Sequence, residues 1–220
     1  MTGFPFDTVA FDLDGTLADT APDLAAALNH ALRSLGRKEV PAEEVRNLIG
    51  HGARALLRRG LAETGESNEA LVEAAFPTLI DYYAANICVG TRAYPGVEQA
   101  LDALKARGVR LAICTNKPER LTHLLLDALA WRGRFDAIVG GDTCGVRKPD
   151  PRPLHEAIAR AGGGRGAFVG DSIVDADTAR AAGVKLVAVS FGFSDRPVEA
   201  LGADAVIDRY EDLIPTLERL

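Results

Sequence analysis

The sequence predicts an α/β fold: a doubly wound, Rossmann-like parallel sheet core with an inserted helical cap domain. Short strand-like runs in it are apolar throughout instead of alternating, as is typical of parallel strands that helices cover on both faces. Each run is followed by a polar cluster and then by a helical pattern, which is the βαβ signature. A long stretch of helical sequence, residues 18–92, separates the first two strands and predicts the cap.

The sheet is predicted from apolar runs rich in Val, Ile and Ala. These runs are residues 9–11, 109–114, 137–139, 167–169 and 184–189. Helices of the sheet-bearing part are predicted at residues 97–107, 118–130, 153–161 and 173–182. In doubly wound sheets ligands bind outside the carboxyl ends of the strands, so the residues that directly follow each run are the candidates for a site.

The interval after the first strand is predicted to hold helices and no convincing strand. Its first helix should begin at Thr20, which we expect to act as the cap with Asp23 three positions later. Further helices are expected over residues 42–49, 53–63 and 69–86. We expect residues 18–92 to form a helical cap over the strand ends, hinged near 18–19 and 91–95, and residues 1–17 and 93–220 to form the core. Cap closure would exclude water, and a purely structural helical extension is the alternative.

Composition restricts the class of partner. Apolar residues make up 47% and charged residues 25% of the chain, as in an ordinary globular protein. The net charge of −6 and the pI near 5.3 disfavour nucleic acid and anionic membranes as partners, whereas a small anionic substrate is compatible with a local basic site. No apolar stretch reaches the ~18 residues of a membrane span, and the first residues lack the features of a signal peptide, so we expect a cytoplasmic protein.

The cysteines argue against a disulfide scaffold or a zinc site. The three of them, Cys88, Cys114 and Cys144, are far apart, and none belongs to a C-x-x-C motif. We expect buried free thiols.

Two carboxylates, Asp12 and Asp14, come directly after the first apolar run. Burying acidic side chains beside a core is costly unless a cation compensates them, and a divalent metal would compensate both. One carboxylate could attack an electrophile while the other moves a proton, a division suited to substitution at phosphorus. A turn built from Asp and Gly is the alternative for this segment taken alone.

Polar residues also follow the later strands: Thr115 and Asn116, then Lys148, then Asp171 with Asp175 four residues on. Three acidic residues and a backbone carbonyl form a hard oxygen cage suited to magnesium. A hydroxyl, an amide and an ammonium would hold the remaining oxygens of a phosphoryl group, whose charge is spread over three equatorial oxygens. Each signal alone is a common turn, cap or solvated charge, but their order at successive strand ends predicts phosphoryl transfer.

At these positions the chain resembles the haloacid dehalogenase superfamily of phosphohydrolases, over essentially its whole length. The matching motifs are D-L-D-G-T at 12–16, T-N at 115–116, K-P at 148–149 and G-D-S-I-V-D at 170–175. The resemblance implies that Asp12 is the nucleophile, becoming an aspartyl-phosphate, and that Asp14 is the general acid and base. It further implies that Mg²⁺ is held by the Asp12 side chain, the Asp14 carbonyl and Asp171, with Asp175 a ligand or a residue that orients one. The implied phosphate-binding residues are Thr115, Asn116 and Lys148, and Lys148 would also neutralise Asp12.

Within the superfamily the sequence is most similar to the phosphoglycolate phosphatases. The supporting stretches are residues 12–23, T-N-K-P at 115–118, G-G-D-T at 140–143 and residues 146–154. This similarity implies a magnesium-dependent phosphatase of a small phosphomonoester, first of all 2-phosphoglycolate, acting as a monomer or homodimer. The alternatives are an isomerase like β-phosphoglucomutase, a hydrolase of a sugar phosphate or nucleotide, and a non-catalytic module that kept the fold.

The cap segment 49–54 occupies the place of that family's substrate-contacting loop. We expect His51 and Arg54 to meet a small carboxylate there, as hydrogen-bond and charge partners. The family often has Asn at the position of His51, so the identity of the leaving group stays open. Arg54 could equally be a surface charge of a helix.

Overall fold

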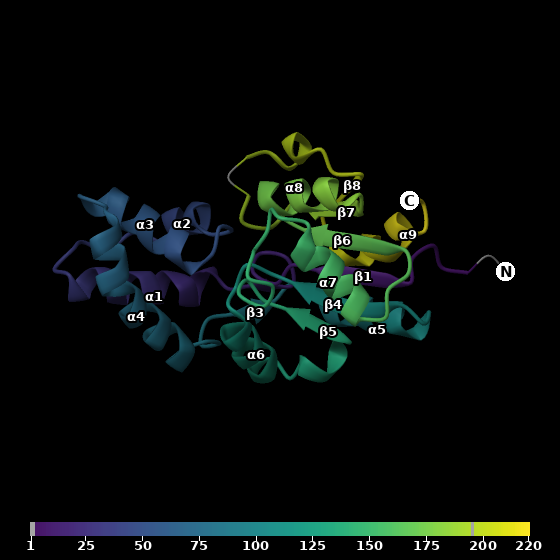
Figure 1. Ribbon diagram of the computed structural model, residues 1–220, viewed down its shortest axis with the longest axis horizontal. Helices are drawn as coiled ribbons and strands as arrows, with labels where there is room; N and C mark the ends of the chain where they lie inside the picture. The colour runs from purple at the N-terminus through teal and green to yellow at the C-terminus, as the bar shows by residue number, and fades with distance from the viewer. Residues whose placement is uncertain (1–2, 195) are drawn as a thin grey trace.

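The computed structural model describes residues 3–194 and 196–220, and a parallel six-stranded sheet forms its centre (Figure 1). The strands are β1 (Thr8–Phe11), β4 (Arg110–Cys114), β5 (Ala137–Val139), β6 (Gly166–Gly170), β7 (Lys185–Val189) and β8 (Ala205–Ile207). Their order is β5-β4-β1-β6-β7-β8, so β1 is central, with Phe11 opposite Ile113 of β4 and Val169 of β6. The chain builds β4 and β5 on one side of β1 and then crosses to β6 on the other side, so the ends of β1, β4 and β6 lie together at the switch in strand order.

Helices cover both faces of the sheet. They are α5 (Val97–Ala106), α6 (Glu119–Ala128), α7 (Arg152–Arg160), α8 (Ile173–Ala182) and α9 (Leu213–Leu217), with 3₁₀ turns at Arg132–Arg134, Val198–Leu201 and Tyr210–Asp212. Alternate residues of β1 enter different hydrophobic clusters: Val9 and Phe11 pack with α5 and α9, whereas Ala10 packs with α7 and α8. Both faces of the strand are therefore buried, which explains why its sequence is apolar throughout.

Residues 18–92 form a helical unit beside the sheet, with α1 (Ala21–Ser34), α2 (Ala42–Val45), a 3₁₀ turn (Arg46–Leu48), α3 (Ala53–Thr64) and α4 (Glu69–Ala85). The unit lies at the left of Figure 1 and has a hydrophobic cluster that includes Leu28, Leu57 and Leu79. Two short antiparallel strands, β2 (Ala18–Asp19) and β3 (Arg92–Ala93), join where the chain leaves the sheet and returns to it. The prediction that this interval holds no strand is therefore wrong at its two ends.

The beginning of α1 also differs from the prediction. Thr20 makes no side-chain cap hydrogen bond. Instead of completing a capping box, the Asp23 carboxylate accepts hydrogen bonds from the Gly90 and Thr91 amides, both at 2.8 Å, and from the Thr91 hydroxyl at 2.7 Å. Asp23 therefore ties the start of the helical unit to its end, where local sequence spacing could not reveal the partner.

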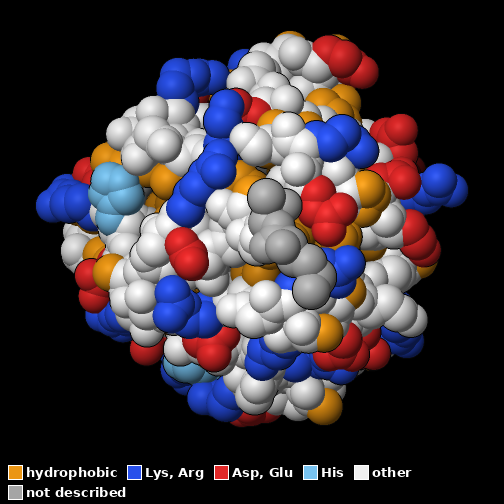
Figure 2. All heavy atoms as spheres, turned by 90° about the vertical axis from the view of Figure 1, so that its right-hand side faces the viewer, with side chains coloured by type: hydrophobic (Ala, Val, Ile, Leu, Met, Phe, Trp, Pro, Cys, Tyr) orange, Lys and Arg blue, Asp and Glu red, His pale blue; other side chains and the backbone are white. Residues whose placement is uncertain are grey.

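Surface and cysteine features complete the description. Acidic and basic side chains are interspersed on the face of the sheet-bearing part seen in Figure 2. Within the described residues, no helix is both long and apolar enough to cross a membrane.

The cysteines are free thiols, but Cys114 is fully buried whereas Cys88 and Cys144 are partly exposed. The prediction of burial is therefore correct for Cys114 and wrong for the other two.

Candidate active site

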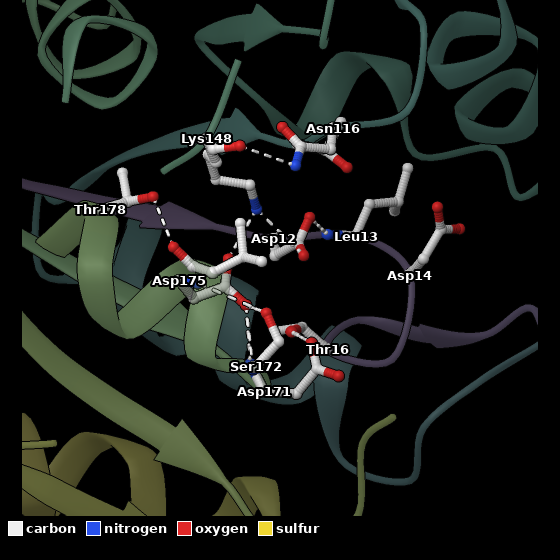
Figure 3. A network of polar contacts seen from close by, with 12 residues as sticks. Asp12, Leu13, Asp14, Thr16, Asn116, Lys148, Asp171, Ser172, Asp175 and Thr178 are labelled. Atoms are coloured by element: carbon white, nitrogen blue, oxygen red, sulfur yellow. Dashed lines mark hydrogen bonds and ion pairs between the residues drawn. The ribbon is translucent and has the colours of Figure 1, made fainter. Parts of the chain in front are cut away.

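Asp12 lies directly beyond the central strand, with its side chain held from two sides. Its amide continues the sheet by donating to the Val169 carbonyl at 2.9 Å. One carboxylate oxygen accepts from the Leu13 amide at 2.7 Å, and the other lies 3.0 Å from the Lys148 ammonium (Figure 3). Lys148 also contacts Asp175 at 2.6 Å, and its side chain is only 1% exposed. The buried lysine thus bridges two carboxylates that come from different strand ends.

Three buried carboxylates, those of Asp12, Asp171 and Asp175, form a cluster at the ends of β1 and β6. Each offers an oxygen, and these atoms all lie within 4.8 Å of one another. The Asp171 carboxylate accepts hydrogen bonds from the Thr16 hydroxyl and the Phe193 amide, both at 2.7 Å. Three carboxylates face one ammonium, so the cluster has an excess of negative charge that matches one divalent cation, and its oxygen donors are those that magnesium prefers.

Asp175 is the most deeply buried of the three carboxylates, at 0% exposed, and it accepts the most hydrogen bonds. One oxygen accepts from Lys148, and the other accepts from the Ser172 amide at 3.0 Å and the Ser172 hydroxyl at 2.6 Å. Ser172 and Asp175 form a reciprocal capping box at the start of α8. The capping box fixes Asp175, and Asp175 in turn fixes the Lys148 ammonium.

Burial sets the protonation of this cluster. It raises the pKa of Asp12 from 3.8 to about 6, because desolvation and the neighbouring carboxylates Asp175 and Asp14 outweigh the attraction of Lys148. Burial, with Asp175 and Asp12, raises the pKa of Asp171 well above its ordinary value. For Lys148 burial acts in the opposite sense, but Asp12 and Asp175 prevail and raise its pKa, so the lysine is charged. Without a further cation the carboxylates are therefore held in an unfavourable environment.

Asp14 points away from this cluster, because the chain turns at Gly15, which has φ +82°. A Cβ at Gly15 would lie 2.5 Å from an Asp171 oxygen, so only glycine fits this turn. The two Asp14 oxygens lie 2.9 and 3.1 Å from the ammonium of Lys117, which follows β4. Lys117 also donates to the hydroxyl of Tyr83, on α4 of the helical unit, at 2.6 Å. Burial raises the pKa of Tyr83, so its hydroxyl keeps its proton.

Lys117 and Tyr83 were not among the predicted site residues. Lys117 stands in the T-N-K-P stretch, one residue beyond the predicted pair Thr115 and Asn116, so its position was a usable signal. Tyr83 gave no such signal, since an aromatic residue on a helix usually indicates packing.

Thr115 and Asn116 lie at the end of β4. The Thr115 hydroxyl accepts from the Lys117 amide at 3.3 Å, and the Asn116 amide group donates to the Lys148 carbonyl at 3.1 Å. The structure therefore brings Asn116 to the loop that bears Lys148, and it places Thr115 in the lining of the same cavity as Asp12.

A small cavity of about 40 Å³ lies between the strand ends and the helical unit. The lining residues of the sheet-bearing part are Asp12, Asp14, Thr115, Asn116, Lys117, Pro118 and Leu121. Those of the helical unit are Leu24, Ile49, Gly50, Gly52, Ala53, Leu56 and Tyr83. The residues that follow β1 and β4 thus share one cavity with residues of α1, α3 and α4 and of the loop before α3.

The structure places His51 and Arg54 beside this cavity rather than among its lining residues. Arg54 pairs with Glu73 and lies over the Phe76 ring, 4.1 Å from its centroid. His51 is flanked by Gly50 and Gly52, which do line the cavity.

Comparison with known proteins gives consistent matches along the chain. A sequence model of the family described as haloacid dehalogenase-like hydrolase matches residues 9–189. The phosphoglycolate phosphatase of Caulobacter vibrioides is 46% identical over 94% of this chain and 88% of its own length. That of Agrobacterium fabrum is 43% identical over 99% of this chain and 95% of its own. Among solved structures, a predicted phosphoglycolate phosphatase from Haemophilus somnus is 31% identical, with a TM-score of 0.89 and coverage of 96% of this chain and 97% of that one.

Proposed function

The chain belongs to the haloacid dehalogenase-like hydrolases, and from this premise we propose that it hydrolyses 2-phosphoglycolate to glycolate and phosphate through an aspartyl-phosphate on Asp12. It is a phosphoric monoester hydrolase. The observation that supports the mechanism most is the buried Asp12 carboxylate at the end of the central strand, paired with Lys148 and next to two further carboxylates. The substrate assignment is supported by the two phosphoglycolate phosphatases that match nearly the whole chain.

In the first half of the reaction an Asp12 oxygen attacks phosphorus and the bond from phosphorus to the glycolate oxygen breaks. Asp14 donates the proton that the leaving oxygen takes up. In the second half water attacks the phosphorus of the aspartyl-phosphate, Asp14 accepts the proton, and the bond to Asp12 breaks to restore its carboxylate. Lys148 offsets the charge of the nucleophile as a phosphate dianion approaches it. Thr115, Asn116 and Lys148 would hold the phosphoryl oxygens.

The residues present fit magnesium as the cofactor. Asp12, Asp171 and the Asp14 carbonyl would hold it, while Asp175, which is fully buried and bonded to Lys148 and Ser172, would orient its neighbours. When bound, Mg²⁺ supplies positive charge to the phosphoryl oxygens and offsets the repulsion among the buried carboxylates.

We further propose that residues 18–92 act as a cap domain and that residues 1–17 and 93–220 are the catalytic core. The β2–β3 pair would be the hinge, and closure would shield the reacting phosphoryl group from water. The proposed compartment is the cytoplasm, the proposed partner is the small-molecule phosphomonoester alone, and the proposed assembly is a monomer or homodimer. Contact of His51 and Arg54 with substrate stays a prediction.

Phosphate release by the purified protein with Mg²⁺ tests the substrate assignment. The panel would contain 2-phosphoglycolate, glucose 1-phosphate, glucose 6-phosphate and a nucleoside monophosphate, with Asp12→Asn as the inactive control. We expect the highest kcat/KM for 2-phosphoglycolate and no release by the variant. A higher kcat/KM for another phosphate would overturn the substrate, and labelled phosphate retained on a sugar product would indicate a mutase instead.

A further inference from the structure

Lys117 is a buried cation that lines the cavity and has no role in the reaction steps described above. Its side chain is 2% exposed, and its ammonium lies 2.9 Å from Asp14 and 2.6 Å from the Tyr83 hydroxyl. Burying a lysine to this extent costs free energy, because the ammonium is strongly hydrated in water, unless the charge is paired or binds a ligand. Its position therefore suggests a function in the cavity.

The hydrogen-bonding capacity of this pair exceeds what the two partners use. The three hydrogens of the ammonium point at the two Asp14 oxygens, 2.9 and 3.1 Å away, and at the Tyr83 oxygen, so a ligand would take the place of the longer Asp14 contact. The Tyr83 oxygen accepts from Lys117, so the hydrogen of the tyrosine hydroxyl is directed elsewhere and can be donated as well. Lys117 and Tyr83 together thus offer two donors to an anion.

The charge of the cavity singles out Lys117. Among the described residues that line it, Lys117 has the one basic side chain. Lys148 is already engaged by Asp12 and Asp175, and Arg54 is engaged by Glu73 and Phe76. Lys117 is paired with Asp14, but it is the cation on the cavity wall, and a second anionic group of the substrate, separate from its phosphate, would meet it there.

On the basis of the proposed function, we propose that Lys117 and Tyr83 form the subsite that binds the carboxylate of the leaving group. Lys117 is two residues beyond Thr115, and a hydrogen bond between the Lys117 amide and the Thr115 hydroxyl fixes that short turn. The phosphate end and the carboxylate end of a two-carbon acid are then bound by one loop. Tyr83 lies on α4 of the helical unit, so the preference for a carboxylate depends on that unit as well as on the loop after β4.

The walls of the cavity favour a short leaving group. Apolar side chains of Leu24, Ile49 and Leu56 line it from the cap. A Cβ at Gly52 would lie 3.5 Å from the Asn116 carbonyl oxygen, so the cap loop runs close against the loop that follows β4. These contacts leave little room beyond Lys117 for a sugar or a base.

Binding of two phosphonates, measured by calorimetry with Mg²⁺, tests this subsite without requiring turnover. 3-Phosphonopropionate has the carboxylate of 2-phosphoglycolate with a methylene in place of the ester oxygen, and propylphosphonate has a methyl group in place of that carboxylate. We expect the wild type to bind 3-phosphonopropionate more tightly. Lys117→Met should reduce this preference by about 10- to 100-fold, as for loss of a hydrogen bond to a charged group, and Tyr83→Phe by about 2- to 10-fold.

Matched variants separate this effect from general damage. Tyr82→Phe changes the neighbouring tyrosine, which stacks on His30, and Lys105→Met changes an exposed lysine of α5, so both should keep the wild-type preference. Arg54→Gln tests the competing prediction: the Lys117 subsite requires that the preference is kept, because Arg54 pairs with Glu73, whereas contact of Arg54 with the carboxylate would reduce it. If Lys117→Met does not fold, as judged by circular dichroism, Tyr83→Phe decides the outcome because its ring still fills the same space.

The results distinguish failure of the subsite from failure of the proposed function. If the wild type prefers the carboxylated ligand but Lys117→Met and Tyr83→Phe retain that preference, or Arg54→Gln abolishes it, the subsite is overturned and the substrate stands. If the wild type releases phosphate from other esters and shows no preference for the carboxylated phosphonate, the proposed substrate is overturned and the subsite with it.

Discussion

Replacing Asp12 by Asn is expected to abolish turnover and, in the absence of metal, to stabilise the fold. Burial raises the pKa of Asp12 from 3.8 to about 6, so the ionised carboxylate is less favourable in the folded chain than in the unfolded one. At about 1.4 kcal/mol per pH unit, this rise corresponds to about 3 kcal/mol of stability that the wild type forgoes at neutral pH. For a chain of this length about 3 kcal/mol is equivalent to about 6–12 °C in Tm.

The effect depends on pH in a defined direction. Because the folded carboxyl holds its proton more tightly, the free energy of unfolding of the wild type falls as pH rises from about 4 to about 6. Asparagine does not titrate, so the variant lacks this decrease. The advantage of Asp12→Asn should be complete above about pH 7 and absent below about pH 4.

Thermal unfolding in EDTA, followed by circular dichroism, measures this difference. Asp81→Asn, which changes an exposed aspartate of α4, is the matched control and should leave Tm unchanged. Adding Mg²⁺ should stabilise the wild type more than Asp12→Asn, because the amide is a weaker ligand. A Tm of Asp12→Asn below that of the wild type at neutral pH in EDTA would show that the ionised Asp12 carboxylate stabilises the folded chain, contrary to this prediction.

Other variants test the remaining parts of the site. Lys148→Met should destabilise the protein by about 3–5 kcal/mol in urea unfolding, because Asp12 and Asp175 lose their buried partner. Adding Asp12→Asn should recover more than it gains in the wild type, and full additivity would argue against the ion pair. Gly192→Ala should weaken Mg²⁺ binding at least about tenfold in calorimetry, because its Cβ would lie 2.2 Å from the Cβ of Asp171, whereas Gly133→Ala, with open space around it, should bind normally. Removing Mg²⁺ should abolish phosphate release, and restoring it at about 100 times its Kd should stabilise the fold by about 2.7 kcal/mol; activity that persists in EDTA would exclude the metal requirement.

The parallel sheet could be predicted from the sequence because its central strands are buried on both faces. Continuous apolar runs predicted β1, β4, β5, β6 and β7 to within one residue at every end. The edge strand β8 was missed because it has three residues, two of them at least partly exposed, and so lacks such a run. The strands β2 and β3 have two residues each, and only their pairing across the helical unit identifies them.

The site was predictable where its residues follow strands. Asp12, Lys148, Asp171 and Asp175 come together because the ends of neighbouring parallel strands and their loops meet at one edge of the sheet. The contact between Lys117 and Tyr83 depends on how the helical unit lies against the sheet, which no local pattern encodes. Arg54 was expected to meet the substrate from the cap loop, but the local sequence does not show that its partner is Glu73 on the next helix.

Acid quenching during turnover of 2-phosphoglycolate, followed by peptide mass spectrometry, detects the aspartyl-phosphate itself. We expect a phosphoryl group on the Asp12 side chain of the wild type, absent from Asp12→Asn and lost when the quench is delayed until substrate is exhausted. An unmodified Asp12 under quench conditions that preserve acyl phosphates, while phosphate is released at the full rate, would contradict it.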